Sequence, residues 1–311
     1  DRVAEIISHE CPGIRITCSH ALGRIGLLER ENATLLNASL LDLATNTTDA
    51  FRKALDDVGI TAPLYITLND GTVTSSDLAR KFPVYCFASG PTNSMRGAAF
   101  LSGLQDAIVC DVGGTTADIG CLVNGFPREA NNVVEIGGVR TLFRMPDLIS
   151  IGIGGGTMVR ENPLGVGPES VGFRLLEEAR VFGGSQLTLT DVAVASGLMD
   201  VGDKTQISDL PETLFTAALA TAHQKISLTI DQIKTDSQDV PMIAVGGGAP
   251  LIPEKIPGIS EVHRVPFHGV ANAVGAAIAQ ISGEADQVFQ DFTRDDALAA
   301  ALEIAIENAV K

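Results

Sequence analysis

The pattern of hydrophobic and polar positions predicts long helices that alternate with short strands. Apolar side chains recur every three or four positions through residues 32–58 and 212–234, which favours two long amphipathic helices. Shorter helices are predicted over residues 1–11, 91–103, 270–281 and 295–310. Alternating or fully apolar runs predict strands at residues 14–18, 63–68, 107–111, 117–123, 242–245 and 261–267. This mixture indicates an α/β architecture.

Composition and charge limit the class of protein and the kinds of molecule that it is expected to bind. The chain has 311 residues, 45% of them hydrophobic, which argues against disorder and suggests two domains by length. Its net charge of −16 disfavours nucleic acid as a partner. No apolar run approaches the roughly 20 residues of a membrane helix, so we expect no membrane association. Five sparse cysteines do not form a disulfide framework, and we therefore expect a cytoplasmic protein.

Glycine is the unusual component, and its placement points to chemistry. There are 32 glycines, above the roughly 7% of an average protein. The strand at 107–111 ends on Asp111 and leads into the turn Gly113-Gly114-Thr115-Thr116, whose backbone N–H groups can cradle a phosphate. Asp111 would then hold Mg²⁺ through water, with Asp118 on the return strand assisting with metal or water. For this motif alone, a purely structural strand–turn–strand remains an open alternative.

A second glycine loop follows another strand. The strand at 242–245 runs into Gly246-Gly247-Gly248-Ala249-Pro250, where a backbone could pack closely on the base and ribose of a nucleotide. Two strand-end loops far apart in sequence suit one nucleotide gripped at both ends. A third stretch, Gly154-Gly155-Gly156, is predicted to line the same cleft.

These motifs carry a family resemblance. Asp-x-Gly-Gly-Thr-Thr-x-Asp followed far downstream by Gly-Gly-Gly-Ala-Pro resembles the phosphate and adenosine loops of the superfamily of actin, sugar kinases and heat-shock chaperone ATPases. More closely, the chain resembles the ATP-binding subunit of the hydantoinase/5-oxoprolinase family. The matching segments are residues 22–39, 88–99, 111–118, 153–157, 166–170, 190–191 and 246–250.

The resemblance implies an actin-like (ribonuclease H-like) ATPase fold. Residues 1–95 would be the remainder of its first lobe and residues 96–311 the second lobe, with the phosphate and adenosine loops. It also implies ATP and Mg²⁺ as cofactors and ATP-dependent opening of a cyclic amide, such as a hydantoin, an oxoproline or a lactam, through phosphorylation of the ring carbonyl. A second hydrolase subunit and an oligomeric assembly are further expectations from the resemblance.

The resemblance also assigns roles to individual residues. It makes Asp111 and Asp118 catalytic, with Asp111 as the metal ligand. The expected nucleotide-binding residues are Gly113, Gly114, Thr115, Thr116, Gly154, Gly155, Gly156, Gly246, Gly247, Gly248, Ala249 and Pro250.

The sequence departs from the family pattern in two places. No second Asp-x-Gly-Gly-Thr occurs in residues 1–107, so the chain is expected to lack the first phosphate loop, as a fragment rather than a degenerate homologue. The stretch after Ser170 lacks the Asp-Pro-Gly-Pro-x-Cys-Tyr run of many oxoprolinases, which weakens the case for 5-oxoproline as substrate. A small-molecule kinase and a non-catalytic nucleotide-binding partner stay open as alternatives.

Other candidate sites favour structural interpretations. His9, Cys11, Cys18 and His20 do not have a usual zinc-finger spacing. His268 is interpreted as a packing or capping residue. The sequence has no Gly-Lys pair, which excludes a standard P-loop.

Overall fold

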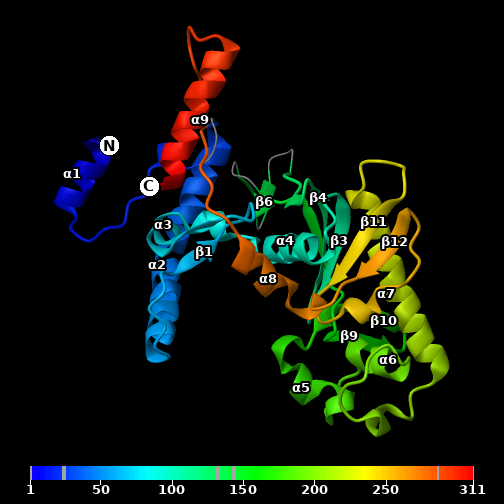
Figure 1. Ribbon diagram of the computed structural model, residues 1–311. Coiled ribbons are helices and arrows are strands. Elements are labelled where there is room, and N and C mark those ends of the chain that lie inside the picture. Colours follow the sequence, from blue (N-terminus) through cyan, green and yellow to red (C-terminus); the bar gives the residue numbers. More distant parts are fainter. Residues whose placement is uncertain are drawn as a thin grey trace. The chain divides into compact units, whose positions relative to one another are not determined.

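The computed structural model describes residues 2–22, 26–130, 134–136, 138–141, 145–285 and 287–310 (Figure 1). The chain forms two compact units. The first contains residues 1–89, 129–145 and 279–311, and the second contains residues 90–128 and 146–278. The division expected at residue 95 between two actin-like lobes stays a prediction. The candidate site residues all belong to the second unit.

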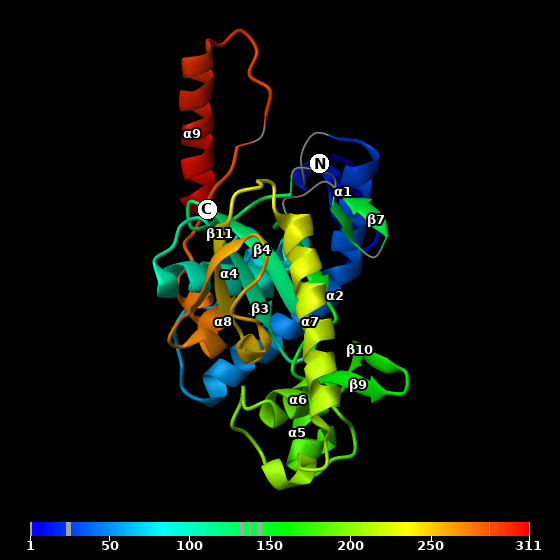
Figure 2. The ribbon, with the colours of Figure 1, turned by 90° about the vertical axis from the view of Figure 1, so that its right-hand side faces the viewer.

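The second unit is built on a mixed six-stranded sheet with the order β12-β11-β3-β4-β5, in which β8 also pairs with β4. Strand β11 is parallel to both β3 and β12, whereas β4 is antiparallel to β3, β5 and β8. Strands β9 and β10 form a separate antiparallel pair (Figure 2). The strands are β3 (Ala107–Val112), β4 (Ala117–Val123), β5 (Phe126–Pro127), β8 (Leu148–Ile151), β9 (Thr157–Glu161), β10 (Leu164–Ser170), β11 (Val240–Val245) and β12 (Ile259–Arg264).

Helices cover both faces of this sheet (Figure 1). On one face, Ile226 and Ile230 of the long helix α7 are fully buried in a core shared with β3, β4 and β11. On the other face, Met95 and Ala98 of α4 pack in a second core with Val109. The helices of this unit are α4 (Ser89–Ser102), α5 (Leu175–Glu178), α6 (Leu189–Ala195), α7 (Glu212–Ile233) and α8 (Ala271–Ile278).

The first unit is organised around helix α2 (Leu28–Asp57), thirty residues long. Asn37 lies on its buried face, donates a hydrogen bond to the carbonyl of Lys81 (3.0 Å) and accepts one from the amide of Val84 (3.3 Å). The other elements are α1 (Arg2–Glu10), β1 (Tyr65–Thr67), β2 (Val73–Ser75), α3 (Ser76–Lys81), β6 (Val134–Ile136), β7 (Val139–Thr141) and α9 (Arg294–Val310).

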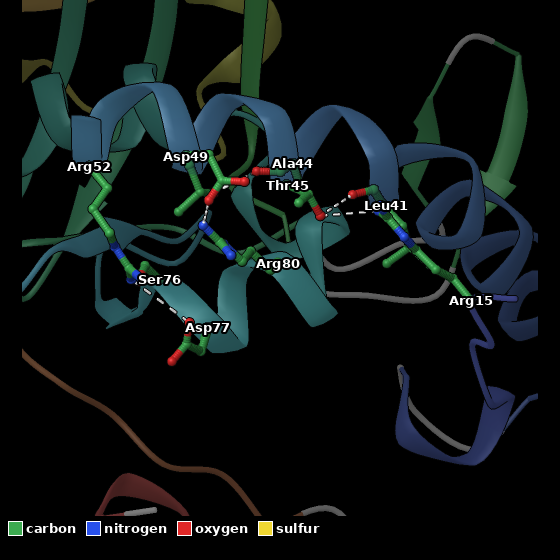
Figure 3. Close-up of polar contacts among 10 residues, drawn as sticks. Arg15, Leu41, Ala44, Thr45, Asp49, Arg52, Ser76, Asp77 and Arg80 are labelled. Atoms are coloured by element: carbon green, nitrogen blue, oxygen red, sulfur yellow. Dashed lines mark hydrogen bonds and ion pairs between the residues drawn. The ribbon is translucent and has the colours of Figure 1, made fainter. Parts of the chain in front are cut away.

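Arginine side chains link α2 to α3 within the first unit, as Figure 3 shows. Arg52 donates to the hydroxyl of Ser76 (2.7 Å), and Arg80 of α3 pairs with Asp49. These contacts lie partly or fully in solvent, where ion pairs contribute little to stability. The described apolar core of this unit is a small cluster around Leu22, Ala33 and Val84.

The local sequence pattern predicts the long helices correctly but some strands wrongly. The two long helices are confirmed, at Leu28–Asp57 and Glu212–Ile233. The strand expected at 14–18 is wrong: these residues have no regular secondary structure, and Ile14 is exposed. The strand expected to reach residue 267 ends at Arg264, because the chain turns there. None of the described helices combines the length and apolarity needed to cross a membrane.

Candidate functional site

Two carboxylates lie side by side near the end of the hairpin formed by β3 and β4. Asp111 and Asp118 are direct partners in the antiparallel register of these strands. Directly opposite residues on paired strands project from the same face of a sheet. Cys110, which precedes Asp111 on β3, is fully buried in the core on the α7 side. The two carboxylates therefore project from the face that α4 covers.

Burial and hydrogen bonds from two serines have opposite effects on the pKa values of these two carboxyls. Burial raises the pKa of the Asp111 carboxyl, and a hydrogen bond from the Ser94 hydroxyl of α4 opposes that shift. Burial likewise raises the pKa of the Asp118 carboxyl; a hydrogen bond from Ser150 of β8 opposes this shift, and the negative charge of Asp111 adds to it. Placing a cation between the carboxylates would relieve both the burial cost and the mutual repulsion.

The raised pKa of Asp111 predicts an effect on stability in metal-free buffer. A carboxyl whose folded-state pKa exceeds its unfolded-state value of about 3.8 stabilises the fold at acidic pH, and this contribution is lost as pH rises through the folded-state pKa. We expect Asp111→Asn to melt at a higher temperature than wild type near neutral pH with EDTA present, the difference shrinking towards acidic pH. Thermal unfolding across this range measures it, and a lower melting temperature at neutral pH would contradict the assignment.

The Gly113 loop (residues 113–116), which joins β3 to β4, is held by the Gly154 loop (residues 152–157). The amides of Gly155 and Gly156 donate to the carbonyls of Gly113 and Gly114, at 2.9 and 2.6 Å. A Cβ placed on Gly154 would lie only 2.7 Å from the backbone nitrogen of Thr115. The close approach of the two loops therefore requires glycine at position 154. It also holds two carbonyl oxygens of the Gly113 loop in hydrogen bonds to the Gly154 loop.

A Thr-Asp pair at the start of α6 supports the Gly154 loop in turn. The hydroxyl and the amide of Thr190 both donate to the carbonyl of Gly155, at 2.9 and 2.8 Å. Asp191 is fully buried and accepts hydrogen bonds from the amides of Val181 (2.6 Å) and Thr188 (2.7 Å). Thr190 thus positions the Gly154 loop directly, whereas Asp191 caps the start of α6, the helix that carries Thr190, and both side chains are buried.

The Gly246 loop (residues 246–250) lies against the Asp111 end of β3, because β11 and β3 are parallel neighbours with Val245 opposite Asp111. Gly246 has φ +86°, and a Cβ there would lie 2.3 Å from Oδ1 of Asp111. The amide of Gly248 donates to the carbonyl of Val112 (2.7 Å). His268 exchanges two hydrogen bonds with the backbone of Gly246, at 2.9 and 3.0 Å, in agreement with its predicted packing role.

Two glycines of the site, Gly114 and Gly247, have open space where a side chain would be. A Cβ on Gly114 or on Gly247 would meet no atom within 4 Å, and neither residue has a left-handed backbone. Both are exposed, and they follow the carboxyl ends of adjacent parallel strands. Ligands of open α/β sheets bind at such carboxyl ends. Neither packing nor backbone conformation explains glycine here, whereas close approach of a ligand to the backbone would.

The donor set fits Mg²⁺ held together with a nucleotide. Among the described residues no group of three or more His, Cys, Asp or Glu side chains could enclose a metal ion. Magnesium in phosphate sites usually takes one or two carboxylates and fills its other positions with phosphate oxygens and water. Asp111 and Asp118 supply that number, and the exposed turn of the Gly113 loop lies next to them.

The structure thus brings Asp111, Asp118, the Gly113 loop and the Gly246 loop to one edge of the sheet. The predicted residues Gly154, Gly155 and Gly156 are buried and contact the Gly113 loop, and Ala249 is buried in the core. Direct contact of any of the predicted site residues, these included, with a nucleotide or Mg²⁺ stays a prediction. Sequence reasoning missed Ser94 and Ser150. Ser94 lies within the segment 88–99 that carries the resemblance, which is the only signal for it, whereas Ser150 had none.

Comparison with known sequences identifies related proteins. The family model described as hydantoinase/oxoprolinase matches residues 30–205. An uncharacterized protein of Methanocaldococcus jannaschii is 23% identical over 89% of this chain and 47% of its own length. The acetophenone carboxylase gamma subunit of Aromatoleum aromaticum is 27% identical over 64% of this chain and 29% of its own length.

Solved structures share the fold. Nucleotide-free acetone carboxylase, from a study of ATP-dependent acetone carboxylation, matches with a TM-score of 0.70 and 19% identity, over 99% of this chain and 49% of that one. The ATP-dependent caprolactamase of Pseudomonas jessenii matches with a TM-score of 0.70 and 18% identity, over 99% of this chain and 51% of that one. This chain therefore spans about half the length of these structures. The expected α/β, actin-like fold is confirmed, and the lack of a first phosphate loop stays a prediction.

Proposed function

This chain belongs to the hydantoinase/oxoprolinase family, and we propose that it is the ATP-binding part of an ATP-dependent enzyme that activates a carbonyl group. One observation carries the proposal: a half-buried carboxylate pair and two exposed glycine turns converge at the carboxyl ends of the parallel strands β3 and β11. That combination suits a metal-bound nucleotide. Two solved structures that share the fold, acetone carboxylase and caprolactamase, are described as ATP-dependent.

Each part of the site has a defined task in this proposal. Asp111 and Asp118 hold Mg²⁺, with Ser94 and Ser150 orienting their carboxylates. The exposed backbone of the Gly113 loop orients the phosphates, and the Gly246 loop receives the adenosine. ATP supplies the phosphoryl group for transfer. The protein contributes positioning and charge neutralisation, which dominate catalysis of phosphoryl transfer.

We propose a cyclic amide as the substrate class. A ring amide is a poor electrophile, and forming a C–O–P bond at its carbonyl oxygen turns that oxygen into a leaving group. Forming this bond from ATP releases ADP. One water then adds to the carbon and the C–N bond of the ring breaks, with the nitrogen taking a proton, which leaves an acyl phosphate. A second water displaces phosphate from the acyl carbon to give the ring-opened acid. The ATP-dependent caprolactamase supports this chemistry, while the acetone and acetophenone carboxylases are named for ketones.

Product analysis separates the proposal from its alternatives. Incubation of the enzyme, purified together with the second subunit proposed below, with Mg-ATP and caprolactam, hydantoin or 5-oxoproline should release inorganic phosphate together with a ring-opened acid, as detected by mass spectrometry. A small-molecule kinase would instead leave the phosphate on the substrate. A non-catalytic nucleotide-binding protein would bind ATP without either product, which would overturn the proposed activity.

We further propose that the enzyme contains a second subunit and assembles as an oligomer. The support is a relative that is itself described as the gamma subunit of a carboxylase. The substrate pocket would then be completed outside this chain. Co-purification of the tagged protein from its own cells, with identification of the bound proteins, tests this composition. Recovery of the protein without a stoichiometric partner would contradict it.

A further inference from the structure

A turn after β12 holds an aromatic residue in a backbone conformation that normally selects glycine. The amide of His268 donates to the carbonyl of Val265 (3.3 Å), which closes a four-residue turn with Pro266 in second place and Phe267 in third. Phe267 has φ +63° and ψ +19°. Proline in second place with positive φ in third defines a turn whose third residue is usually Gly or Asn. A bulky side chain in this conformation is an outlier.

Packing within the chain does not explain the choice of phenylalanine. The Phe267 side chain is 73% exposed, so it gains little from hydrophobic burial. The chain therefore accepts both a strained backbone and an exposed aromatic ring at one position. Strained residues of this kind persist mainly at ligand sites and switches. A ligand that covers the ring would account for both features.

The turn is attached to the Gly246 loop. His268, which directly follows Phe267, donates from Nδ1 to the carbonyl of Gly246 (3.0 Å) and accepts from the Gly246 amide (2.9 Å). Gly247 follows Gly246 and has open space where a side chain would be. Phe267 directly precedes His268, and Gly247 directly follows Gly246. The exposed ring and the exposed glycine backbone therefore both adjoin the hydrogen-bonded pair His268–Gly246.

We propose that Phe267 is the platform on which the purine base of the bound nucleotide stacks, beside the exposed backbone of Gly247. This inference rests on the proposed function, because it takes ATP as the ligand. Every nucleobase has a π-face, so stacking on an aromatic ring contributes affinity with little discrimination among bases. The purine, rather than a protein partner, is the expected occupant because the ring is anchored to the loop that faces the nucleotide.

Three substitutions separate the ring from the strain. Phe267→Ala removes the ring and keeps a side chain in the left-handed conformation, Phe267→Gly removes both, and Phe267→Tyr keeps the ring. Each variant is titrated calorimetrically with Mg-ATP and, separately, with magnesium tripolyphosphate, which lacks a base. Phe100→Ala, which removes an exposed ring from α4 in the same unit, is the matched control.

We expect Phe267→Ala to bind Mg-ATP about 10-fold more weakly than wild type, in the range found when a base-stacking ring is removed. Its affinity for tripolyphosphate should stay unchanged, and Phe267→Tyr and Phe100→Ala should bind both ligands as wild type does. Phe267→Gly should lose ATP affinity like Phe267→Ala, yet melt about 2–4 °C higher than that variant, because glycine tolerates positive φ.

Unchanged ATP affinity in Phe267→Ala, or an equal loss of tripolyphosphate affinity, overturns this inference while leaving the proposed function intact. A change of assembly mass in Phe267→Ala without a change of ATP affinity assigns the ring to a partner and overturns it as well. Failure of the wild-type protein to bind Mg-ATP overturns the proposed function, and the purine platform falls with it.

Discussion

Asp111→Asn is expected to lower the ATP turnover of the protein by at least about 100-fold, because charge stabilisation by a bound metal contributes several kcal/mol to a transition state. Asp111 lies where the Gly113 and Gly246 loops meet, and a Cβ on Gly246 would almost touch its carboxylate. Asparagine keeps the shape and the capacity to bond with Ser94, but it removes the negative charge that holds Mg²⁺. Phosphate release at saturating Mg-ATP measures the loss.

Asp209→Asn is the matched control for this substitution. Asp209 is an exposed carboxylate of the same unit that pairs with Arg180, and removing it should leave turnover within about twofold, since exposed ion pairs contribute little. Thermal unfolding of both variants excludes loss of the fold. Turnover of Asp111→Asn within a few-fold of wild type would remove Asp111 from the metal site.

Gly246→Ala is expected to lower the free energy of unfolding by about 2–5 kcal/mol. The added methyl group would lie 2.3 Å from both Oδ1 of Asp111 and the carbonyl oxygen of Val112, and the backbone has φ +86°. One obstacle is main chain, so a rotamer change cannot relieve the overlap. Denaturant unfolding monitored by circular dichroism measures the loss.

Gly247→Ala, one residue further on, should behave in the opposite way. A methyl group there meets nothing within 4 Å, so the free energy of unfolding should stay within about 0.5 kcal/mol of wild type, as for ordinary surface substitutions. The same methyl group would occupy space that the nucleotide needs, and Mg-ATP affinity should fall about 10-fold, as expected for overpacking of a binding site. Unaltered affinity in Gly247→Ala, or a stable Gly246→Ala, would show that the two glycines are wrongly assigned.

This contrast shows what local sequence can and cannot predict. The strand–turn–strand around Asp111 and Asp118 is local, so spacing alone predicted the two strands and placed Asp118 on the return strand. The direct pairing of the two residues comes from the register of β3 and β4. Gly246 and Gly247 are indistinguishable in sequence. Their difference arises from β3, which the parallel pairing with β11 brings against one glycine and not the other.

Long-range contacts account for the other discrepancies. Residues 14–18 alternate in polarity like a strand, but a strand needs a neighbour to receive its hydrogen bonds, and the local pattern cannot supply one. Ser150 reaches Asp118 only because β8 pairs with β4. The sequence pattern predicts Phe267 as the last residue of a strand, and only the turn at 265–268 reveals its strained and exposed state.

We propose that this unit binds ATP through a metal held by Asp111 and Asp118. Calorimetric titration of the purified protein with ATP, with Mg²⁺ and again with EDTA, tests it most directly. We expect one ATP to bind per chain, in a manner that depends on Mg²⁺ and is strongly weakened in Asp111→Asn. Absence of binding by the wild-type protein, or equal binding by both proteins with and without Mg²⁺, would contradict it.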